Sequence, residues 1–372
     1  MKIPTLSFGD LTARLPIIQG GMGVGISLSG LASAVANEGG VGVIASSMIG
    51  MRDPERAKDP EGADRRGLID EIRKARAKMT DGLLGVNIMC ALTNYSDMVR
   101  TSLREGVDLI ISGAGLPLDL PGYLREMRDE LKNEVRTKLV PIVSSGRAAS
   151  ILCRKWLNRF DYLPDGFVVE GPKAGGHLGF KPEQLEMPEY QLEQIVAEVI
   201  EAVTPYREKN IKNIPVIAAG GVYTGEDIAR FIEMGAAGVQ MGTRFVATEE
   251  CDADVAFKRA YVNAKKEDVT IIKSPVGMPG RALRNAFLDA VSTGLKKPKK
   301  CIHKCLHNCA EEKSPYCIAQ ALVNAYRGKF NYGFAFAGAN AYLVDKIITV
   351  KELMGTLKDE FERFRSPNEP TE

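Results

Sequence analysis

Short apolar runs recur along the first two thirds of the chain, and the intervals between most neighbouring runs leave room for a helix. Each run has the length of a strand, and β-branched residues are frequent in them, which is typical of strands buried on both faces. Such strands alternating with helices predict a parallel sheet. The eight runs are residues 16–20, 40–45, 83–89, 107–112, 139–144, 166–170, 214–219 and 238–242.

Several of the intervening segments have helical patterns. Residues 29–37 are small and apolar, as in a tightly packed helix, whereas residues 67–79 and 189–208 are amphipathic. Residues 224–234 begin with TGED, a start similar to a capping box, and Gly235 is placed to end that helix. Eight strand–helix units in about 250 residues predict an α/β protein with a (β/α)8 TIM barrel, rather than an open doubly wound sheet.

The sequence pattern changes after Phe245. We expect the barrel to occupy residues 1–250, and a mostly helical, cysteine-rich subdomain of residues 251–372 to pack on the barrel and cover its mouth. Residues 272–284 predict a turn-rich basic loop. Helical patterns occupy residues 252–266, 317–326 and 350–362, and an aromatic, glycine-rich stretch occupies residues 330–342.

Composition and charge narrow the classes of partner. The apolar fraction of 45% and the charged fraction of 26% are those of a soluble globular protein. A net charge of +2 gives no indication of a nucleic-acid partner. The chain has no apolar run of about 18 residues, so no membrane partner is expected. The N-terminal segment carries prolines and charges where a signal peptide has an apolar core, which predicts a cytoplasmic location.

Glycine and small polar residues follow the expected strands repeatedly. In a parallel barrel these positions meet at the C-terminal face, where active sites are built. Glycines that merely end strands would explain one or two pairs, but recurrence at so many strand ends favours a ligand lying across the backbone. The positions are residues 20–23, 87, 112–115, 144–146, 220–221 and 242–243.

A histidine stands out in the turn after the sixth apolar run. His177 is one of only three histidines in the chain, and it lies in the segment DGFVVEGPKAGGHLGF, residues 165–180. Its unperturbed pKa near neutrality suits a general base or acid. Gly175 and Gly176 lack a Cβ atom, so a flat ligand can approach their backbone. A structural loop with an incidental histidine is the alternative.

The last two expected strands predict a phosphate site. Gly220 and Gly221 follow the seventh strand, and Gly242 and Thr243 follow the eighth. Loops seven and eight of a barrel, with a helix N-terminus beyond them, commonly bind phosphate through backbone N–H groups. Arg244 is a candidate for additional positive charge, although a surface or structural role explains it equally well.

Five motifs taken together resemble those of the 2-nitropropane dioxygenase-like flavoproteins, which include nitronate monooxygenases and the FMN-dependent enoyl-acyl-carrier-protein reductase II. The motifs are PIIQGGMGVG, GVN, EGPKAGGHLG, VIAAGGV and GVQMGTRF, and the resemblance covers residues 4–245. It implies a TIM barrel that binds FMN non-covalently and acts on a small molecule, with His177 as the catalytic residue. By motif match, the residues around FMN are Gly21, Met22, Asn87, Glu170, Lys173, Gly175, Gly176, Gly220, Gly221, Gly242 and Thr243.

Two features depart from that family pattern. In FAGANAY, Ala339 and Asn340 stand where the family often has glutamine. The larger departure is a cluster of cysteines between residues 301 and 317, accompanied by His303 and His307. Cysteines crowded in a cytoplasmic protein suggest an iron–sulfur cluster or zinc, with reduced thiols as the alternative. The expected ligands are Cys301, Cys305, Cys309 and Cys317.

Three functions follow as hypotheses. The first is an FMN-dependent nitronate monooxygenase in which His177 serves as the catalytic base or orients the nitronate. The second is an NAD(P)H-dependent reductase similar to enoyl-acyl-carrier-protein reductase II, for which the basic residues Arg281 and Arg284 would suit a phosphorylated carrier or NADPH. The third is a redox-sensing protein that binds flavin and an iron–sulfur cluster. The oligomeric state is left open, with a homodimer as one alternative.

Overall fold

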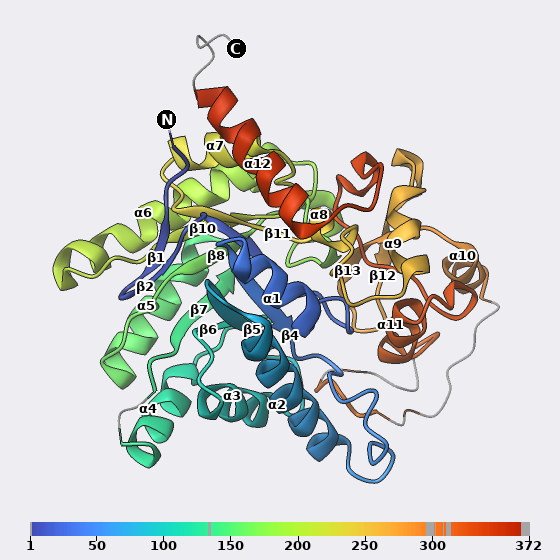
Figure 1. The fold of residues 1–372 in the computed structure, drawn as a ribbon, viewed down its shortest axis with the longest axis horizontal. Coiled ribbons are helices and arrows are strands. Elements are labelled where there is room, and N and C mark those ends of the chain that lie inside the picture. Colours follow the sequence, from blue (N-terminus) through green and yellow to red (C-terminus); the bar gives the residue numbers. More distant parts are fainter. Residues whose placement is uncertain are drawn as a thin grey trace.

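The computed structural model describes residues 2–132, 135–294, 301, 303–307, 309 and 314–365. Its centre is a closed barrel of eight parallel strands in the order β10-β11-β3-β4-β5-β6-β7-β8 (Figure 1). Each predicted apolar run contains or overlaps one of these strands, so the (β/α)8 barrel is confirmed. The strands are β3 (Ile17–Gln19), β4 (Val41–Ala45), β5 (Leu83–Met89), β6 (Leu109–Gly113), β7 (Lys138–Val143), β8 (Phe167–Glu170), β10 (Val216–Ala219) and β11 (Gly238–Met241).

Helices surround the barrel, and some of them begin at side-chain caps. In α2 the Asp59 carboxylate accepts from the Gly62 N–H, and Pro60 occupies the first turn, so the helix starts seven residues before the predicted 67. In α7 the predicted capping box forms between Thr224 and Asp227. The helices are α1 (Ser29–Asn37), α2 (Pro60–Lys78), α3 (Tyr95–Arg104), α4 (Leu120–Glu130), α5 (Gly146–Phe160), α6 (Leu192–Asn210), α7 (Gly225–Glu233) and α8 (Thr243–Val246).

A small hairpin closes the N-terminal end of the barrel. Strands β1 (Leu6–Phe8) and β2 (Leu11–Ala13) pair antiparallel. Leu6 and Phe8 are fully buried and pack against residues at the starts of the barrel strands, including Val41 and Leu109. Because this end is sealed by apolar side chains, a ligand site belongs at the opposite, C-terminal mouth.

The C-terminal segment lies beside the barrel and returns to it (Figure 1). The predicted loop over residues 272–284 is wrong, because β12 and β13 form an antiparallel hairpin there, turning through Gly277 at φ +83°. This hairpin joins β9 (Gly176–His177) in a three-stranded sheet, and α12 packs along α7. The remaining elements are α9 (Val255–Val262), β12 (Val269–Lys273), β13 (Pro279–Leu283), α10 (Ala286–Ser292), α11 (Ile318–Tyr326) and α12 (Val350–Arg365).

The predicted helix over residues 252–266 is shortened to α9, which Asp254 caps by accepting from the Ala256 N–H. Short 3-10 turns occupy several connections, and the one at Pro188–Tyr190 delays the start of α6 from 189 to 192. No helix in the described part of the chain has both the length and the apolar character needed to cross a membrane. The division of the chain near residue 250 stays a prediction.

Candidate active site

Two glycine loops lie side by side at the C-terminal mouth, since β10 and β11 are paired neighbours. Gly220 and Gly221 have φ angles of +92° and +103°, a region that favours glycine strongly over residues with a Cβ atom. Gly242 directly follows β11, and Thr243 begins α8. Arg244 is held beside these loops, because its Nη1 donates to the Tyr223 carbonyl at 3.1 Å and its guanidinium lies 4.6 Å from the Tyr223 ring centroid.

The loops after β3, the neighbour of β11, and after β5 form a further part of the mouth. A Cβ atom on Gly21 would lie 2.2 Å from the Cβ of Asn87, so only glycine fits against that side chain. Met22 approaches Gly242, with its sulfur 3.4 Å from the position that a Cβ there would take. The predicted residues Gly21, Met22, Asn87 and Gly242 therefore lie close together.

Gln240 was missed by the sequence analysis. Its Oε1 atom is buried and, within the described residues, has no hydrogen-bond partner. Its side chain lies against Gly20, whose added Cβ would come 3.4 Å from Gln240 Cγ. A buried acceptor without a partner is rare in folded proteins and indicates a site for a ligand or water donor. The only signal in the sequence was a polar residue in the middle of the apolar run GVQMG.

The loop after β8 is held by a residue from the C-terminal hairpin. Arg281 is buried, and its Nη1 donates to the carbonyls of Pro172 and Ala174 at 2.6 and 2.7 Å. Gly175 packs so tightly that an added Cβ would lie 2.6 Å from the Ala337 carbonyl carbon. At the start of this loop, burial raises the pKa of Glu170 to about 7.

His177 lies between the C-terminal hairpin and an aromatic ring. Its Nε2 is 2.6 Å from the hydroxyl of Ser274, and its ring centroid is 4.9 Å from that of Phe336 in an edge contact. Burial lowers the pKa of His177 to about 4, so the imidazole is neutral at neutral pH. Neither Ser274 nor Phe336 could be assigned to the site from sequence, because long-range pairings bring them there: β9 pairs with β13 of the hairpin that carries Ser274, and Phe336 bridges to Ala282 of β13.

The segment FAGANAY closes over the loops that the glycines form. Asn340 Nδ2 donates to the Gly221 carbonyl at 2.7 Å, and the Ala339 N–H donates to the Lys173 carbonyl at 3.0 Å. The Gly338 N–H donates to Thr243 Oγ1 at 3.3 Å. This segment therefore joins three of the predicted cofactor-binding residues. The sequence analysis recorded Ala339 and Asn340 as departures from the family pattern but did not place them.

The cysteine-rich segment docks on the barrel mouth away from His177. The Thr93 N–H donates to the Cys305 carbonyl at 3.2 Å, and Leu306 forms a bridge with Leu92. Burial, together with the nearby thiols of the other three cysteines, raises the pKa of Cys305 to about 12. Within the described residues, however, no group of three or more histidine, cysteine or acidic side chains is placed to hold a metal ion. The four-cysteine metal site stays a prediction.

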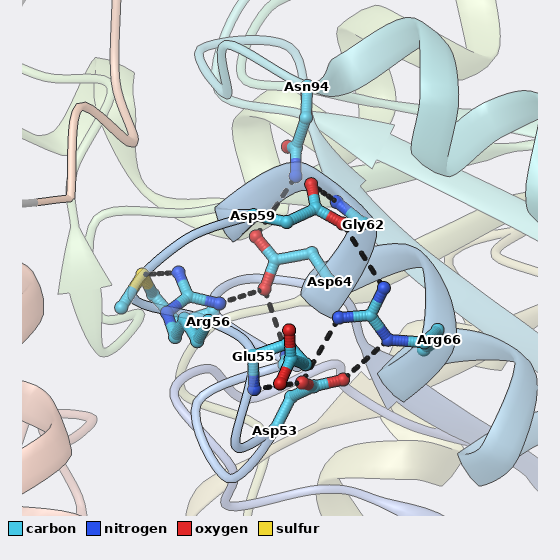
Figure 2. A network of polar contacts seen from close by, with 10 residues as sticks. Asp53, Glu55, Arg56, Asp59, Gly62, Asp64, Arg66 and Asn94 are labelled. Atoms are coloured by element: carbon cyan, nitrogen blue, oxygen red, sulfur yellow. Dashed lines mark hydrogen bonds and ion pairs between the residues drawn. The ribbon is translucent and has the colours of Figure 1, made fainter.

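A cavity of about 250 Å³ lies where this segment meets the loops after β4 and β5, lined among others by Asp64, His303 and Cys305. Figure 2 shows the polar network that contributes Asp59, Asp64 and Asn94 to the lining of this cavity. The Asp64 carboxylate accepts from Arg56 Nη1 at 2.5 Å and from Asn94 Nδ2 at 3.1 Å. Arg66 bridges Asp53 and Asp59. These carboxylates already have cationic or amide partners. We therefore interpret the network as one that holds the loop in its conformation.

Together, these observations define a TIM barrel whose C-terminal mouth is lined by glycine loops and a partly buried histidine. Residues 7–360 match the family model described as nitronate monooxygenase, and the chain belongs to that family. The resemblance stated from the motifs is thus confirmed.

Curated relatives carry two kinds of name. One, from Mycobacterium tuberculosis, is (3aS,4S,5R,7aS)-5-hydroxy-7a-methyl-1-oxo-octahydro-1H-indene-4-carboxyl-CoA dehydrogenase, 29% identical over 75% of this chain and 66% of the relative. Another, a probable nitronate monooxygenase from Staphylococcus aureus strain Newman, is 28% identical over 76% and 79%. The match spans just under two thirds of the first two relatives, at 66% and 64% of their lengths.

Solved structures resemble the whole chain. The structure of FabK from Thermotoga maritima is similar with a TM-score of 0.71 and 28% identity, covering 95% of both chains. A nitroalkane oxidase from Streptomyces ansochromogenes has the same TM-score at 22% identity, covering 96% of this chain and 98% of that one. At that identity the second likeness concerns the fold alone.

Proposed function

We propose that the protein is an FMN-dependent oxidoreductase that oxidises alkyl nitronates, with His177 as its catalytic residue. The observation that carries the proposal is the position of His177, which is neutral and partly buried next to Gly176, with open space where a Cβ atom of Gly176 would lie. Family membership and the probable nitronate monooxygenases among the relatives support this chemistry.

The residues at the mouth fit FMN. A phosphate would be held by the backbone of Gly220, Gly221, Gly242 and Thr243, where two loops from paired strands lie together. The flavin ring would lie towards Gly21, Met22 and Asn87, and Gln240 Oε1 offers a buried acceptor that lacks a partner within the described residues. When bound, FMN supplies the redox chemistry. The loop of Glu170, Lys173, Gly175 and Gly176 would cover its other side.

A reductase that takes electrons from NAD(P)H and acts on an enoyl thioester is the second candidate. The likeness to FabK at 28% identity and the carboxyl-CoA dehydrogenase among the relatives favour it. In that reaction His177 would position the thioester carbonyl or donate a proton. Both candidates use the same cofactor site and differ in the source of electrons.

Anaerobic stopped-flow spectroscopy of the flavin-loaded protein separates the candidates. Rapid loss of flavin absorbance on mixing with an alkyl nitronate, but not with NADH or NADPH, is the result expected of the first. Rapid bleaching by a nicotinamide nucleotide alone would replace it with the second. Flavin that neither reductant bleaches would contradict both enzymatic assignments.

The role of His177 has its own test. His177→Ala should retain FMN but lose turnover by a factor of about 100 to 10,000, the range typical of a positioned acid or base. The matched control is His307→Ala, because His307 is exposed and lies in the cysteine-rich segment. Near-normal turnover by His177→Ala would reduce His177 to a structural loop residue.

A further inference from the structure

Ser274 reaches His177 from the tip of the C-terminal hairpin, 97 residues further along the chain. Its side chain is buried, with 3% exposure. The turn is fixed on both sides of it, because the Ser274 N–H donates to the Met278 carbonyl and the Gly277 N–H donates to the Ser274 carbonyl, both at 3.0 Å. The hydroxyl is therefore held in place beside the imidazole at 2.6 Å.

The contacts of the hydroxyl indicate which partner donates. A buried hydroxyl needs an acceptor for its proton. Within the described residues, Ser274 Oγ contacts two groups, the Val276 N–H at 3.5 Å and His177 Nε2 at 2.6 Å. The Val276 N–H is itself a donor, so Nε2 is the group that can accept. The Ser274 O–H then donates to His177 Nε2.

This assignment determines which nitrogen of the neutral His177 ring carries the proton. A neutral imidazole has one nitrogen that donates and one that accepts. With Nε2 accepting from Ser274, the proton of the neutral ring is on Nδ1. Nδ1 makes no hydrogen bond to the described residues, so it is the ring atom left for a ligand. The edge contact with Phe336 at 4.9 Å restricts rotation of the ring.

We propose that Ser274 is a positioning residue that holds His177 in the Nδ1–H tautomer, so that His177 donates a hydrogen bond to an anionic or carbonyl oxygen of the substrate. The proposal rests on the proposed function and narrows its substrate class. A nitronate anion, which has lost its α-proton and carries negative oxygens, matches such a donor. A neutral nitroalkane requires a base, for which Nδ1 in this tautomer offers no lone pair.

The tautomer is directly measurable by 15N NMR of the uniformly labelled, flavin-loaded protein. The chain has only three histidines, so the His177 signals are assigned by their loss in His177→Gln. A protonated Nδ1 and an unprotonated Nε2 are expected at neutral pH. A proton on Nε2 in the wild-type protein would overturn the proposal. This readout does not depend on turnover, so it separates failure of the tautomer assignment from failure of the proposed function.

Hydroxyl deletions provide the second test. Ser274→Ala should release the tautomer preference and lower kcat/KM for a preformed nitronate by about 5-fold to 100-fold, as expected for loss of a buried hydrogen bond. Thr270→Val is the matched control, since it deletes a hydroxyl from the same hairpin on β12, opposite Ala282. Ser274→Thr keeps a hydroxyl at this position, so it should retain the Nδ1–H signal of the wild-type protein. An unchanged tautomer in Ser274→Ala would contradict the positioning role.

Activity on paired substrates completes the test. The wild-type protein should turn over a preformed nitronate much faster than the corresponding neutral nitroalkane at the same pH. Equal rates on both, with His177→Ala losing only the nitroalkane reaction, would identify His177 as a base and overturn the donor assignment.

Discussion

The barrel mouth and the C-terminal segment contribute to the candidate site in different ways. The barrel supplies mostly backbone: Gly220 and Gly221 have φ angles that favour glycine, and Gly21 is excluded from carrying a side chain by Asn87. The C-terminal segment supplies side chains that fix that backbone and the histidine, namely Ser274, Arg281 and Asn340. In the proposed function, the barrel loops would contact the cofactor directly, whereas His177 is contacted by a residue of a distant hairpin.

The largest effect is expected from Gly221→Val, which changes a residue of the barrel side. A Cβ atom there would lie 3.0 Å from Lys173 Cβ, and the φ of +103° is strained for a β-branched residue. The variant should fold but purify largely without flavin. The flavin absorbance of the purified protein measures this loss.

The control for this change is Gly106→Val. Gly106 also has positive φ, at +65°, but lies between α3 and β6 with open space around it. It should lose some stability for the same backbone reason and retain flavin. Full FMN occupancy in Gly221→Val would show that the phosphate site is elsewhere.

The next effect tests the link between the two regions. Arg281→Met should lower the free energy of unfolding by about 2–4 kcal/mol, because two buried carbonyls lose their donor. It should also weaken FMN binding, since Pro172 and Ala174 belong to the loop that precedes His177. Chemical denaturation and flavin titration measure the two effects.

Arg284→Met, which breaks an exposed ion pair with Asp289, is the control and should change stability and FMN binding much less. Equal effects would mean that Arg281 is not a specific anchor.

The barrel was predictable because its information is local. Each apolar run contains or overlaps a strand, and residues 83–89 coincide with one, while TGED marks the start of α7. The β12–β13 hairpin was read as a loop because residues 274–280 are rich in proline and glycine, although Val269–Lys273 has strand composition. The pairing of β9 could not be predicted, since Gly176–His177 is only two residues long and its partner lies about a hundred residues further on.

In the candidate site too, the residues in local motifs were predictable, whereas the long-range contacts were not. Motifs at strand ends led to Gly21, Asn87, Gly221 and His177, and the structure brings their loops to one mouth. Ser274 lies in a segment with no periodic signal that connects it to a histidine. Such a contact depends on tertiary packing, so sequence reasoning about neighbouring positions does not detect it.

A third prediction concerns the C-terminal side alone. If the four cysteines hold iron or zinc, replacing Cys305 and Cys309 with serine should release that metal and loosen the segment, while FMN stays bound. Metal analysis of protein purified without oxygen gives the stoichiometry. Cys90→Ser is the control, since Cys90 lies at the barrel mouth and contacts Ser112. Absence of stoichiometric metal in the wild-type protein would show that the thiols do not form a metal site.

The smallest effect is the pH dependence of stability contributed by Glu170, measured on the flavin-free protein. Burial raises the pKa of Glu170 to about 7, from an ordinary value of 4.5. Between these values the folded state keeps a proton that the unfolded state releases, so the contribution of Glu170 to stability falls as pH rises. His177 acts in the opposite direction, because its pKa is lowered from 6.5 to about 4 and the unfolded state binds the extra proton.

Glu170→Gln removes the fall in stability with rising pH that Glu170 contributes, and it leaves the rise that His177 contributes. Relative to wild type, the variant should therefore gain stability as pH rises from about 4.5 to about 7, by about 1 kcal/mol once partial exposure is allowed for. Thermal unfolding midpoints at a series of pH values measure the difference. Glu183→Gln is a suitable control, because Glu183 is exposed on a nearby turn. A difference between Glu170→Gln and wild type that does not vary with pH would mean that Glu170 titrates at its ordinary value, and the barrel side of the site would then be more open to water than its burial indicates.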